Sequence, residues 1–202
     1  MTPFTVLTAI AAYYPRPNVD TDLVIRVERC ARVPRPELGK WAFEMARYLP
    51  GGGENPDFVL NRDPWRRAQI LVGAENFGCG SSREMAVWAI AGMGIRCVIA
   101  PSFGQIFFDN CFQNGVLAIR LPADAHARVA ALASDPATAT LKVDLEAQRI
   151  NGDIAFDIDP LRKRMLLEGL DEIGLTLSRA AEIDAFQQAD RARRPWAWPE
   201  PG

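Results

Sequence analysis

The stretch that decides the fold reads Gly73-Ala74-Glu75-Asn76-Phe77-Gly78-Cys79-Gly80-Ser81-Ser82-Arg83-Glu84. An apolar run from Gln69 to Val72 precedes it, and an amphipathic run from Met85 to Ala91 follows it. A short apolar run, a glycine-rich segment and a helix-periodic run in this order predict a strand, a tight turn and a helix.

The residue types within the turn favour an anion. Gly78 and Gly80 can adopt positive φ angles, so the turn can be tight and its amides can approach a ligand. Ser81 and Glu84 have the spacing of a capping box, which predicts a helix that begins just after Ser81. A helix N-terminus and the planar guanidinium of Arg83 both suit a carboxylate or a phosphate.

Each of these residues also has a simpler interpretation. Arg83 could be an exposed arginine of the first helical turn, and Ser81 could be a helix cap rather than a proton-transfer group. Cys79 lies between two glycines and is interpreted as a small packing residue, because no His or Lys lies near it in sequence. The turn lacks the Lys-Ser/Thr ending of a P-loop and the third glycine of a dinucleotide site, which disfavours ATP and NAD.

Hydrophobic periodicity in the rest of the chain predicts alternating strands and helices, which is typical of an α/β core with parallel pairing. The expected elements are a strand at 4–10, strands at 69–72, 96–100 and 116–119, helices from 85, at 103–114 and from 121 to about 133, a hairpin of 140–145 and 149–156, a helix opened by Asp159-Pro160, a break at 169–175 and a last helix at 178–191.

Two loops remain open to more than one interpretation. Asn18-Val19-Asp20-Thr21-Asp22 is either an Asx-type turn that satisfies local backbone amides or a loop that lines a cleft. The segment 26–67 is irregular apart from an expected helix at 36–48, and we interpret it as a mobile loop that could order over a ligand. The domain prediction is one domain over residues 1–192, followed by a Pro/Trp-rich tail over 193–202.

Composition narrows the function further. The 202 residues carry 23 basic and 25 acidic side chains, so neither nucleic acid nor an anionic membrane is expected as a partner. The sequence has neither a membrane-spanning run nor a signal-peptide pattern, which predicts a cytoplasmic protein.

The chain has few cysteine and histidine residues that could bind a metal. Its four cysteines form no C-x-x-C pair; they are Cys30, Cys79, Cys97 and Cys111. His126 is the only histidine, and we predict that it lies on the surface. The chain alone therefore supports neither a metal or iron–sulfur site nor a Ser-His-Asp hydrolase.

Several stretches between Thr5 and Trp196 together resemble one family, the small subunits of 3-isopropylmalate dehydratase, which are similar to the swivelling domain of aconitase. The matching pieces are Asn18-Val19-Asp20-Thr21-Asp22, Asn55-Pro56-Asp57-Phe58-Val59-Leu60-Asn61, the run from Glu75 to Glu84, Ala100-Pro101-Ser102-Phe103, and the run from Gly169 to Leu177. In combination these motifs are far more specific than a single glycine-rich turn.

This resemblance implies a swivelling β/β/α domain of the α/β class that joins a large subunit with a [4Fe–4S] cluster, with no cofactor bound by this chain alone. The implied function is a hydro-lyase that isomerises 2-isopropylmalate and 3-isopropylmalate by dehydration and rehydration in leucine biosynthesis. It further implies that Ser81 is the base and that Arg83 binds a substrate carboxylate. The remaining substrate-binding candidates are Ser82, Asp20, Thr21 and Asp22.

The sequence departs from the family pattern near the expected site. Met85 and Val87 replace a histidine and a proline, and Arg26-Val27 follows Ile25 where the family commonly has Pro-Lys. Two alternatives therefore stay open. One is a related small subunit for another substituted malate, such as methylmalate or citraconate, and the other is a non-catalytic carboxylate-binding or assembly module.

Overall fold

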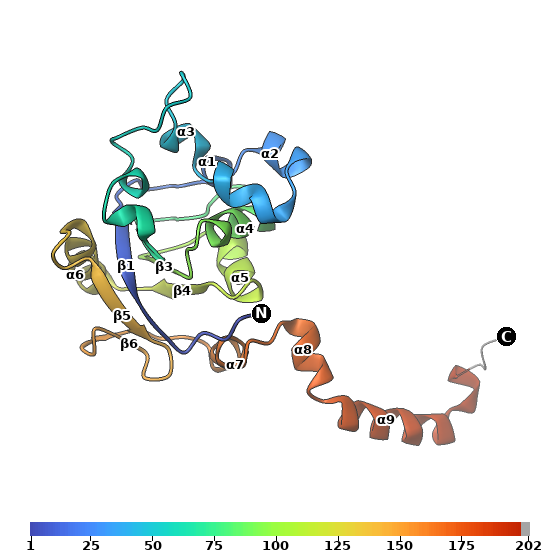
Figure 1. The fold of residues 1–202 in the computed structure, drawn as a ribbon. Helices are drawn as coiled ribbons and strands as arrows, with labels where there is room; N and C mark the ends of the chain where they lie inside the picture. Colours follow the sequence, from blue (N-terminus) through green and yellow to red (C-terminus); the bar gives the residue numbers. More distant parts are fainter. Residues whose placement is uncertain (199–202) are drawn as a thin grey trace.

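The protein is described over residues 1–198 of a computed structural model, and a single seven-stranded sheet runs through it (Figure 1). The strand order is β4-β3-β2-β1-β5-β6-β7. Strands β1 to β4 pair in parallel, whereas β5, β6 and β7 continue the sheet in antiparallel pairing. The strands are β1 (Val6–Tyr14), β2 (Ile70–Gly73), β3 (Cys97–Ala100), β4 (Leu117–Arg120), β5 (Thr140–Asp144), β6 (Arg149–Ile150) and β7 (Ile154–Ala155).

Helices cover both faces of the parallel part of the sheet, as buried parallel strands require. The α-helices are α1 (Thr21–Val24), α2 (Val27–Arg32), α3 (Glu44–Arg47), α4 (Glu84–Gly92), α5 (Gln105–Gln113), α6 (Ala123–Ser134), α7 (Pro160–Glu168), α8 (Glu172–Leu177) and α9 (Ala180–Arg193), and the 3₁₀ turns are η1 (Arg35–Trp41), η2 (Val59–Asn61), η3 (Trp65–Arg67) and η4 (Pro195–Ala197). Helices α4 and α5 lie on one face and α6 on the other (Figure 1). The crossovers β2-α4-β3 and β3-α5-β4 join parallel strands in the same direction, so their common right-handedness places α4 and α5 on the same face.

The α/β prediction is confirmed, and most expected elements of the central region appear close to their predicted positions. All four residues of β2 and of β3 are buried, as expected for central parallel strands. Asp159 caps α7 by accepting hydrogen bonds from the amides of Leu161 and Arg162, with Pro160 at the first helical position. Strand β1 extends to Tyr14, beyond the predicted end at Ile10, because its second half pairs with β2.

The expected helix at 36–48 is wrong. The chain forms η1 and α3 instead, and Phe43 between them has a φ of 55° that no α-helix can contain. Phe43 itself is buried. Gly39 in η1 touches the backbone of Gly92 at the end of α4, so closely that a Cβ on Gly39 would overlap it. Tertiary packing therefore decides the path of the chain here, and the mobility of 26–67 stays a prediction.

Two expectations near the C-terminal end also need correction. The break at 169–175 contains the start of α8, which Asp171 caps by accepting from the amide of Gly174. Arg149–Phe156 is not one strand, because β6 and β7 form their own hairpin around Asn151 and Gly152, both with positive φ.

Helices α8 and α9 extend away from the body of the protein (Figure 1). We call residues 172–198 the C-terminal arm; the rest of the predicted tail, 199–202, lies outside the described residues.

Across residues 1–198, no helix combines the length and the apolar character needed to cross a membrane.

Candidate functional site

The glycine-rich turn lies beside the polar loop Asn18–Asp22, although more than fifty residues separate them in sequence. The amide of Gly78 donates to the carbonyl of Val19 at 2.7 Å, and the amide of Thr21 donates to the carbonyl of Cys79 at 3.0 Å. Gly78 has a φ of 73°, and a Cβ there would overlap the ring of Phe107. The turn therefore requires glycine for its backbone angle and for its close packing.

Side chains fix the same two loops to the end of β3. Asn76 donates through Nδ2 to Oδ1 of Asn18 at 2.8 Å, and its amide donates to Oγ of Ser102 at 2.8 Å. Asn18 and Asn76 both have positive φ, which asparagine tolerates better than most residues. Sequence reasoning missed the role of Ser102. The available signals were its place in the matching piece Ala100-Pro101-Ser102-Phe103 and its position two residues after a buried parallel strand, where ligand-binding loops of α/β sheets gather.

The predicted capping box is wrong. Helix α4 begins at Glu84 with Arg83 at the N-cap, and no side chain caps it. The Glu84 carboxylate instead accepts a hydrogen bond from Nδ2 of Asn114 at 2.9 Å, and Trp88 donates through Nε1 to Oδ1 of the same amide at 2.9 Å. Asn114 thus draws Glu84 away from Ser81, which leaves the serine free for another role.

Ser81 has a fixed backbone and a free hydroxyl. Its carbonyl accepts from Oγ1 of Thr21 at 3.0 Å and from the amide of Arg83 at 2.8 Å. Within residues 1–198 its Oγ has no hydrogen-bond partner, and both Ser81 and Ser82 are exposed. Thr21 is buried, so it supports the turn from the interior of the protein and does not reach a ligand directly.

Arg83 forms an ion pair with Asp22, and the Asp22 carboxylate raises the pKa of the guanidinium. The Arg83 side chain is only 18% exposed, while that of Asp22 is 56% exposed. Nη1 of Arg83, the nitrogen that contacts the Asp22 carboxylate, is buried. Asp20 has a different role, because its Oδ1 accepts from the amide of Leu23 at 2.7 Å and so caps α1. The Asx-type interpretation is confirmed for Asp20.

Cys30 on α2 is a further neighbour of this ion pair. It is half-buried, and burial raises the pKa of its thiol, while the charge of Arg83 acts in the opposite direction. Sequence reasoning missed this proximity because no motif links residue 30 to the turn.

His126 is buried, so its predicted surface position is wrong. Its Nε2 lies 2.7 Å from the carbonyl oxygen of Gly73, and its ring meets that of Tyr13 edge to face with centroids 6.1 Å apart. Helix α6 packs on β1 and β2, and the imidazole satisfies the last carbonyl of β2.

Two of the four cysteines, Cys97 and Cys111, are buried and do not suit an iron–sulfur cluster. Burial raises the pKa of the Cys97 and Cys111 thiols, whereas a cluster ligand must be a thiolate. In the part of the chain that the structure describes, no three His, Cys, Asp or Glu side chains gather in a way that could hold a metal ion.

The turn with the exposed Ser81 and with Arg83 follows β2, at the carboxyl end of the parallel strands of this mixed sheet. The family described as the aconitase C-terminal domain matches residues 1–124. A second family, described as the C-terminal domain of the 3-isopropylmalate dehydratase small subunit, matches residues 172–197. The fold is thus the swivelling α/β domain of the aconitase superfamily.

Full-length relatives narrow this class to one family. The 3-isopropylmalate dehydratase small subunit of Granulibacter bethesdensis is 54% identical and covers 97% of this chain and 96% of its own length. That of Rhodospirillum rubrum is 52% identical, covering 97% of both chains. A solved structure of 3-isopropylmalate dehydratase from Methanocaldococcus jannaschii has a TM-score of 0.64 at 26% identity, covering 90% of this chain and 99% of that one. The chain belongs to the family of 3-isopropylmalate dehydratase small subunits.

Proposed function

We propose that the chain is the small subunit of a cytoplasmic heteromeric hydro-lyase that interconverts 2-isopropylmalate and 3-isopropylmalate by dehydration and rehydration. A large subunit would hold a [4Fe–4S] cluster, whose iron supplies Lewis-acid help to the departing hydroxyl. The observation that carries the proposal is the juxtaposition of the free Ser81 hydroxyl and the ion-paired Arg83 in a chain about half identical to named small subunits.

Ser81 is proposed as the base that removes the proton next to a substrate carboxylate. A serine can do this only if its alkoxide is stabilised, because its hydroxyl is otherwise a weak acid. The first turn of α4 directs unpaired N–H groups and a partial positive charge toward this end of the helix, and Arg83 adds a full charge. Two hydrogen bonds to the Ser81 carbonyl restrict the backbone, so little reorganisation is needed during the reaction.

Arg83 is proposed to bind a substrate carboxylate with its planar fork. Asp22 would keep the guanidinium in place through its contact with Nη1, and a substrate carboxylate would bind the other nitrogens of the fork. Ser82 is exposed beside it and would contribute a hydroxyl to the substrate. Asp20 and Thr21 would act by positioning, since one caps α1 and the other holds the Ser81 carbonyl.

The departures from the family pattern bear unequally on the substrate. Val87 is fully buried, so its side chain packs in the core and does not face a ligand. Met85 is only half-buried in the first turn of α4, two residues after Arg83, and is the better candidate for contact with the substrate's alkyl group. Val27 is 53% exposed, and Arg26 pairs with Glu28 at 3.1 Å.

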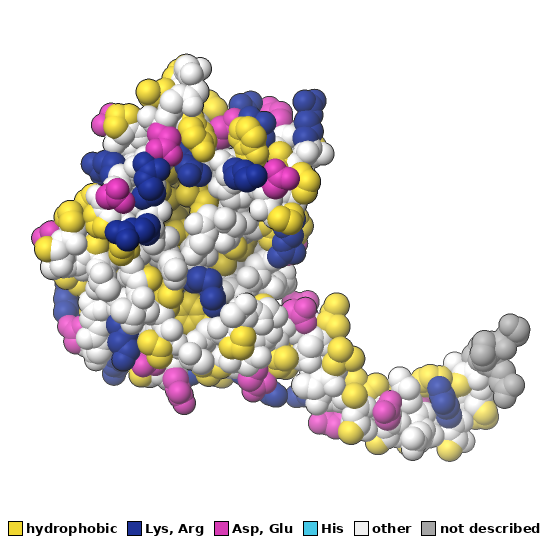
Figure 2. All heavy atoms as spheres, viewed as in Figure 1, with side chains coloured by type: hydrophobic (Ala, Val, Ile, Leu, Met, Phe, Trp, Pro, Cys, Tyr) yellow, Lys and Arg dark blue, Asp and Glu magenta, His cyan; other side chains and the backbone are white. Residues whose placement is uncertain are grey.

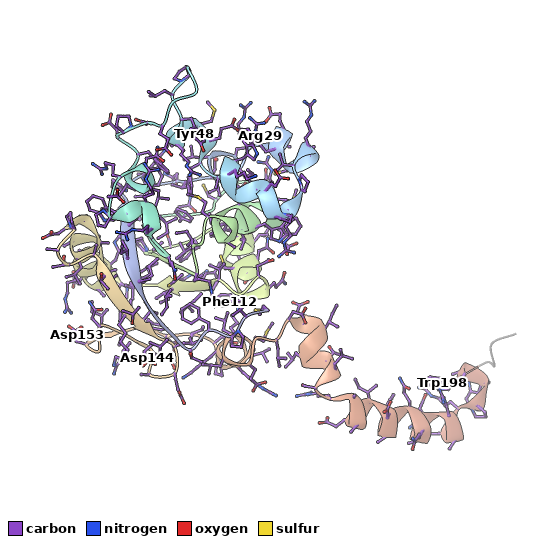
Figure 3. The ribbon with its side chains drawn as sticks, viewed as in Figure 1. Arg29, Tyr48, Phe112, Asp144, Asp153 and Trp198 are labelled. Carbon is purple, nitrogen blue, oxygen red and sulfur yellow. The ribbon has the colours of Figure 1, made fainter. Side chains whose placement is uncertain are left out.

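The segment 26–67 is proposed to order over the bound substrate. It lines a cavity of about 650 Å³ that includes Arg26, Trp41 and Glu44. Arg29, labelled in Figure 3, anchors the base of the segment. Its guanidinium carbon lies 3.4 Å from the centre of the Trp41 ring, and its side chain pairs with Glu44. At its glycine tip, 51–53, a Cβ would meet nothing within 4 Å, and backbone hydrogen bonds with Leu49 close the turn.

The test is reconstitution. The chain and its candidate large subunit are purified together without oxygen, and turnover is measured on 2-isopropylmalate, 3-isopropylmalate, methylmalate and citraconate, with each protein alone as control. We expect turnover only in the mixture and fastest on the isopropylmalates. Faster turnover of methylmalate or citraconate would assign the chain to another substituted malate, whereas no turnover on any acid would favour a non-catalytic assembly module.

A further inference from the structure

The C-terminal arm exposes large apolar side chains that its own chain does not cover. Ile173 is 71% exposed, Leu177 66%, Phe186 62% and Trp196 77%. In the space-filling view such side chains line the arm along its length (Figure 2). Among the residues of α9, only Asp190 is buried. An exposed apolar surface of this kind on a projecting element marks a binding surface rather than part of a core.

A groove lies along the arm between α7 and α9, with a volume of about 790 Å³. Its apolar lining consists of Leu161, Leu175, Ile183, Phe186 and Trp198. Ile183 and Phe186 are three residues apart on α9 and so share one face of that helix. The groove therefore brings together apolar side chains from separate parts of the chain, with polar side chains between them.

The far end of the groove is held rigid by Asp190. This carboxylate accepts from Nε and Nη2 of Arg194, both at 2.8 Å, and from Nε1 of Trp198 at 3.0 Å. Arg191 lies 4.7 Å from the centre of the Trp198 ring (Figure 3). Trp198 is thus oriented before any partner arrives, which lowers the entropy lost on binding.

The charge of the arm identifies the kind of partner that fits it. Residues 172–198 contain four acidic side chains (Glu172, Glu182, Asp184, Asp190) and four basic ones (Arg179, Arg191, Arg193, Arg194), for no net charge. An anionic membrane or nucleic acid would select a basic surface. The groove itself is lined by two arginines and one glutamate beside its apolar residues, so it has no strong charge of either sign. Such a groove instead fits a largely apolar segment of another protein.

The base of the arm connects to the helix that carries the candidate site. Gln113 at the end of α5 donates through Nε2 to Glu172 at the start of the arm, at 3.0 Å. The next residue, Asn114, binds Glu84 in the first turn of α4. A protein that completes the site beside Arg83 is therefore within reach of the arm.

The two family matches indicate why such an arm is present. Residues 1–124 match a domain described as the C-terminal domain of aconitase, that is, as one part of a longer chain. Residues 172–197 match a domain described for small subunits. A separate subunit lacks the high effective concentration that a covalent link provides, so its partner must be held by contact.

We propose that the C-terminal arm binds an apolar segment of the large subunit in this groove and so replaces the missing covalent link. This inference rests on the proposed function, because it takes its partner from there. The arm contributes affinity for the partner, not chemistry, since within residues 1–198 none of its hydrogen bonds involves Ser81 or Arg83.

The experiment uses the full-length chain with a double substitution, Ile183→Asp with Phe186→Asp. The matched control is Ala181→Asp with Ala185→Asp, which adds the same charge to the same helix at exposed residues outside the groove. Two measurements are made: the dissociation constant for the large subunit, and turnover as a function of the concentration of the small subunit. Circular dichroism and sedimentation of each variant alone report folding and self-association.

We expect the groove variant to weaken large-subunit binding at least thirtyfold and to raise the half-saturating concentration equally, with turnover at saturation unchanged. The control should bind within threefold of the unaltered chain. Equal binding by the groove variant and the control would overturn the inference and leave the proposed function intact. Loss of self-association in the groove variant, with unchanged large-subunit binding, would assign the groove to a second copy and overturn the inference too. Failure of the unaltered chain to bind the large subunit would instead contradict the proposed function.

Discussion

Arg83 shows how a single residue can serve both the fold and the proposed chemistry. It occupies the N-cap of α4, where its positive charge opposes the helix dipole, and Asp22 offsets that charge from the neighbouring loop. Asp22 remains more exposed than Arg83, so solvent and a substrate carboxylate can both compete for the guanidinium. The ion pair therefore positions Arg83 without closing the site.

Replacing Arg83 with lysine tests whether substrate binding depends on the planar shape of the guanidinium or only on its positive charge. Arg83→Lys keeps the positive charge but loses the planar fork, and we expect the Michaelis constant of the reconstituted enzyme to rise about tenfold or more, because a charge-assisted hydrogen bond contributes roughly 1.5–3 kcal/mol. The turnover number should fall less. Arg149→Lys, on an exposed residue of β6, is the control. A Michaelis constant equal to that of the control would remove Arg83 from substrate binding.

At the residue scale, sequence reasoning identified the turn and its neighbours but not the contacts that set their roles. The sequence pairs Ser81 with Glu84, whereas Asn114, thirty residues further along the chain, captures Glu84 in the folded protein. His126 likewise lies on an alanine-rich helix, and only the packing of α6 on β2 buries it against the Gly73 carbonyl. Local spacing cannot reveal such long-range partners.

At the scale of elements, sequence periodicity predicted best where a strand or helix is set by its own residues. Strands β2, β3 and β4 and helix α7 appear close to their predicted places because each has a clear apolar run or an Asp-Pro cap. The prediction failed at 36–48, where contact between Gly39 and Gly92 and the positive φ of Phe43 override helix propensity. Tertiary contacts decide short irregular helices more than local sequence does.

The end of α9 offers a prediction about pH. Hydrogen bonds from Arg194 and Trp198 hold the pKa of the Asp190 carboxyl well below its usual range. A group whose folded pKa lies below its unfolded value of about 3.9 stabilises the fold above that value, and the effect is lost as the pH falls further. We therefore expect the Arg194 amide, which donates to the Asp190 carbonyl, to keep its exchange protection from pH 7 to about pH 5 and to lose it progressively below about pH 4.

Hydrogen exchange on two variants checks this assignment. Asp190→Asn should reduce protection at the end of α9 already at neutral pH and should remove its acid dependence. Asp184→Asn, an exposed residue of the same helix, should behave like the unaltered chain. Unchanged protection in Asp190→Asn would mean that the carboxylate does not hold the end of the arm.

At the scale of the whole molecule, the chain forms one wall of a site and a projecting arm. Ser81 and Ser82 lie exposed beside Arg83, so a second surface is needed to exclude water and complete a catalytic cleft. The arm extends from the same end of α5 that contacts the site helix. Both features fit a protein whose function depends on a partner.

The sequence already indicates that the chain depends on a partner, because the spacing of its cysteines has no ligand pattern for an iron–sulfur cluster. It does not anticipate the projecting arm, because the helix pattern at 178–191 does not reveal whether its apolar face meets its own chain. The swivelling fold and the grouping of the Ser81-Arg83 turn with the Asn18–Asp22 loop are both expected from the combined motifs.

The most direct test of the central proposal is turnover of Ser81→Ala in the reconstituted complex, measured at equal occupancy of the large subunit. Ser134→Ala, at the end of α6 on the opposite face of the sheet, is the control. If Ser81 is the base, its loss should lower the turnover number by about 10² to 10⁴ while the complex still forms. Turnover of Ser81→Ala within a fewfold of Ser134→Ala would contradict the proposed mechanism.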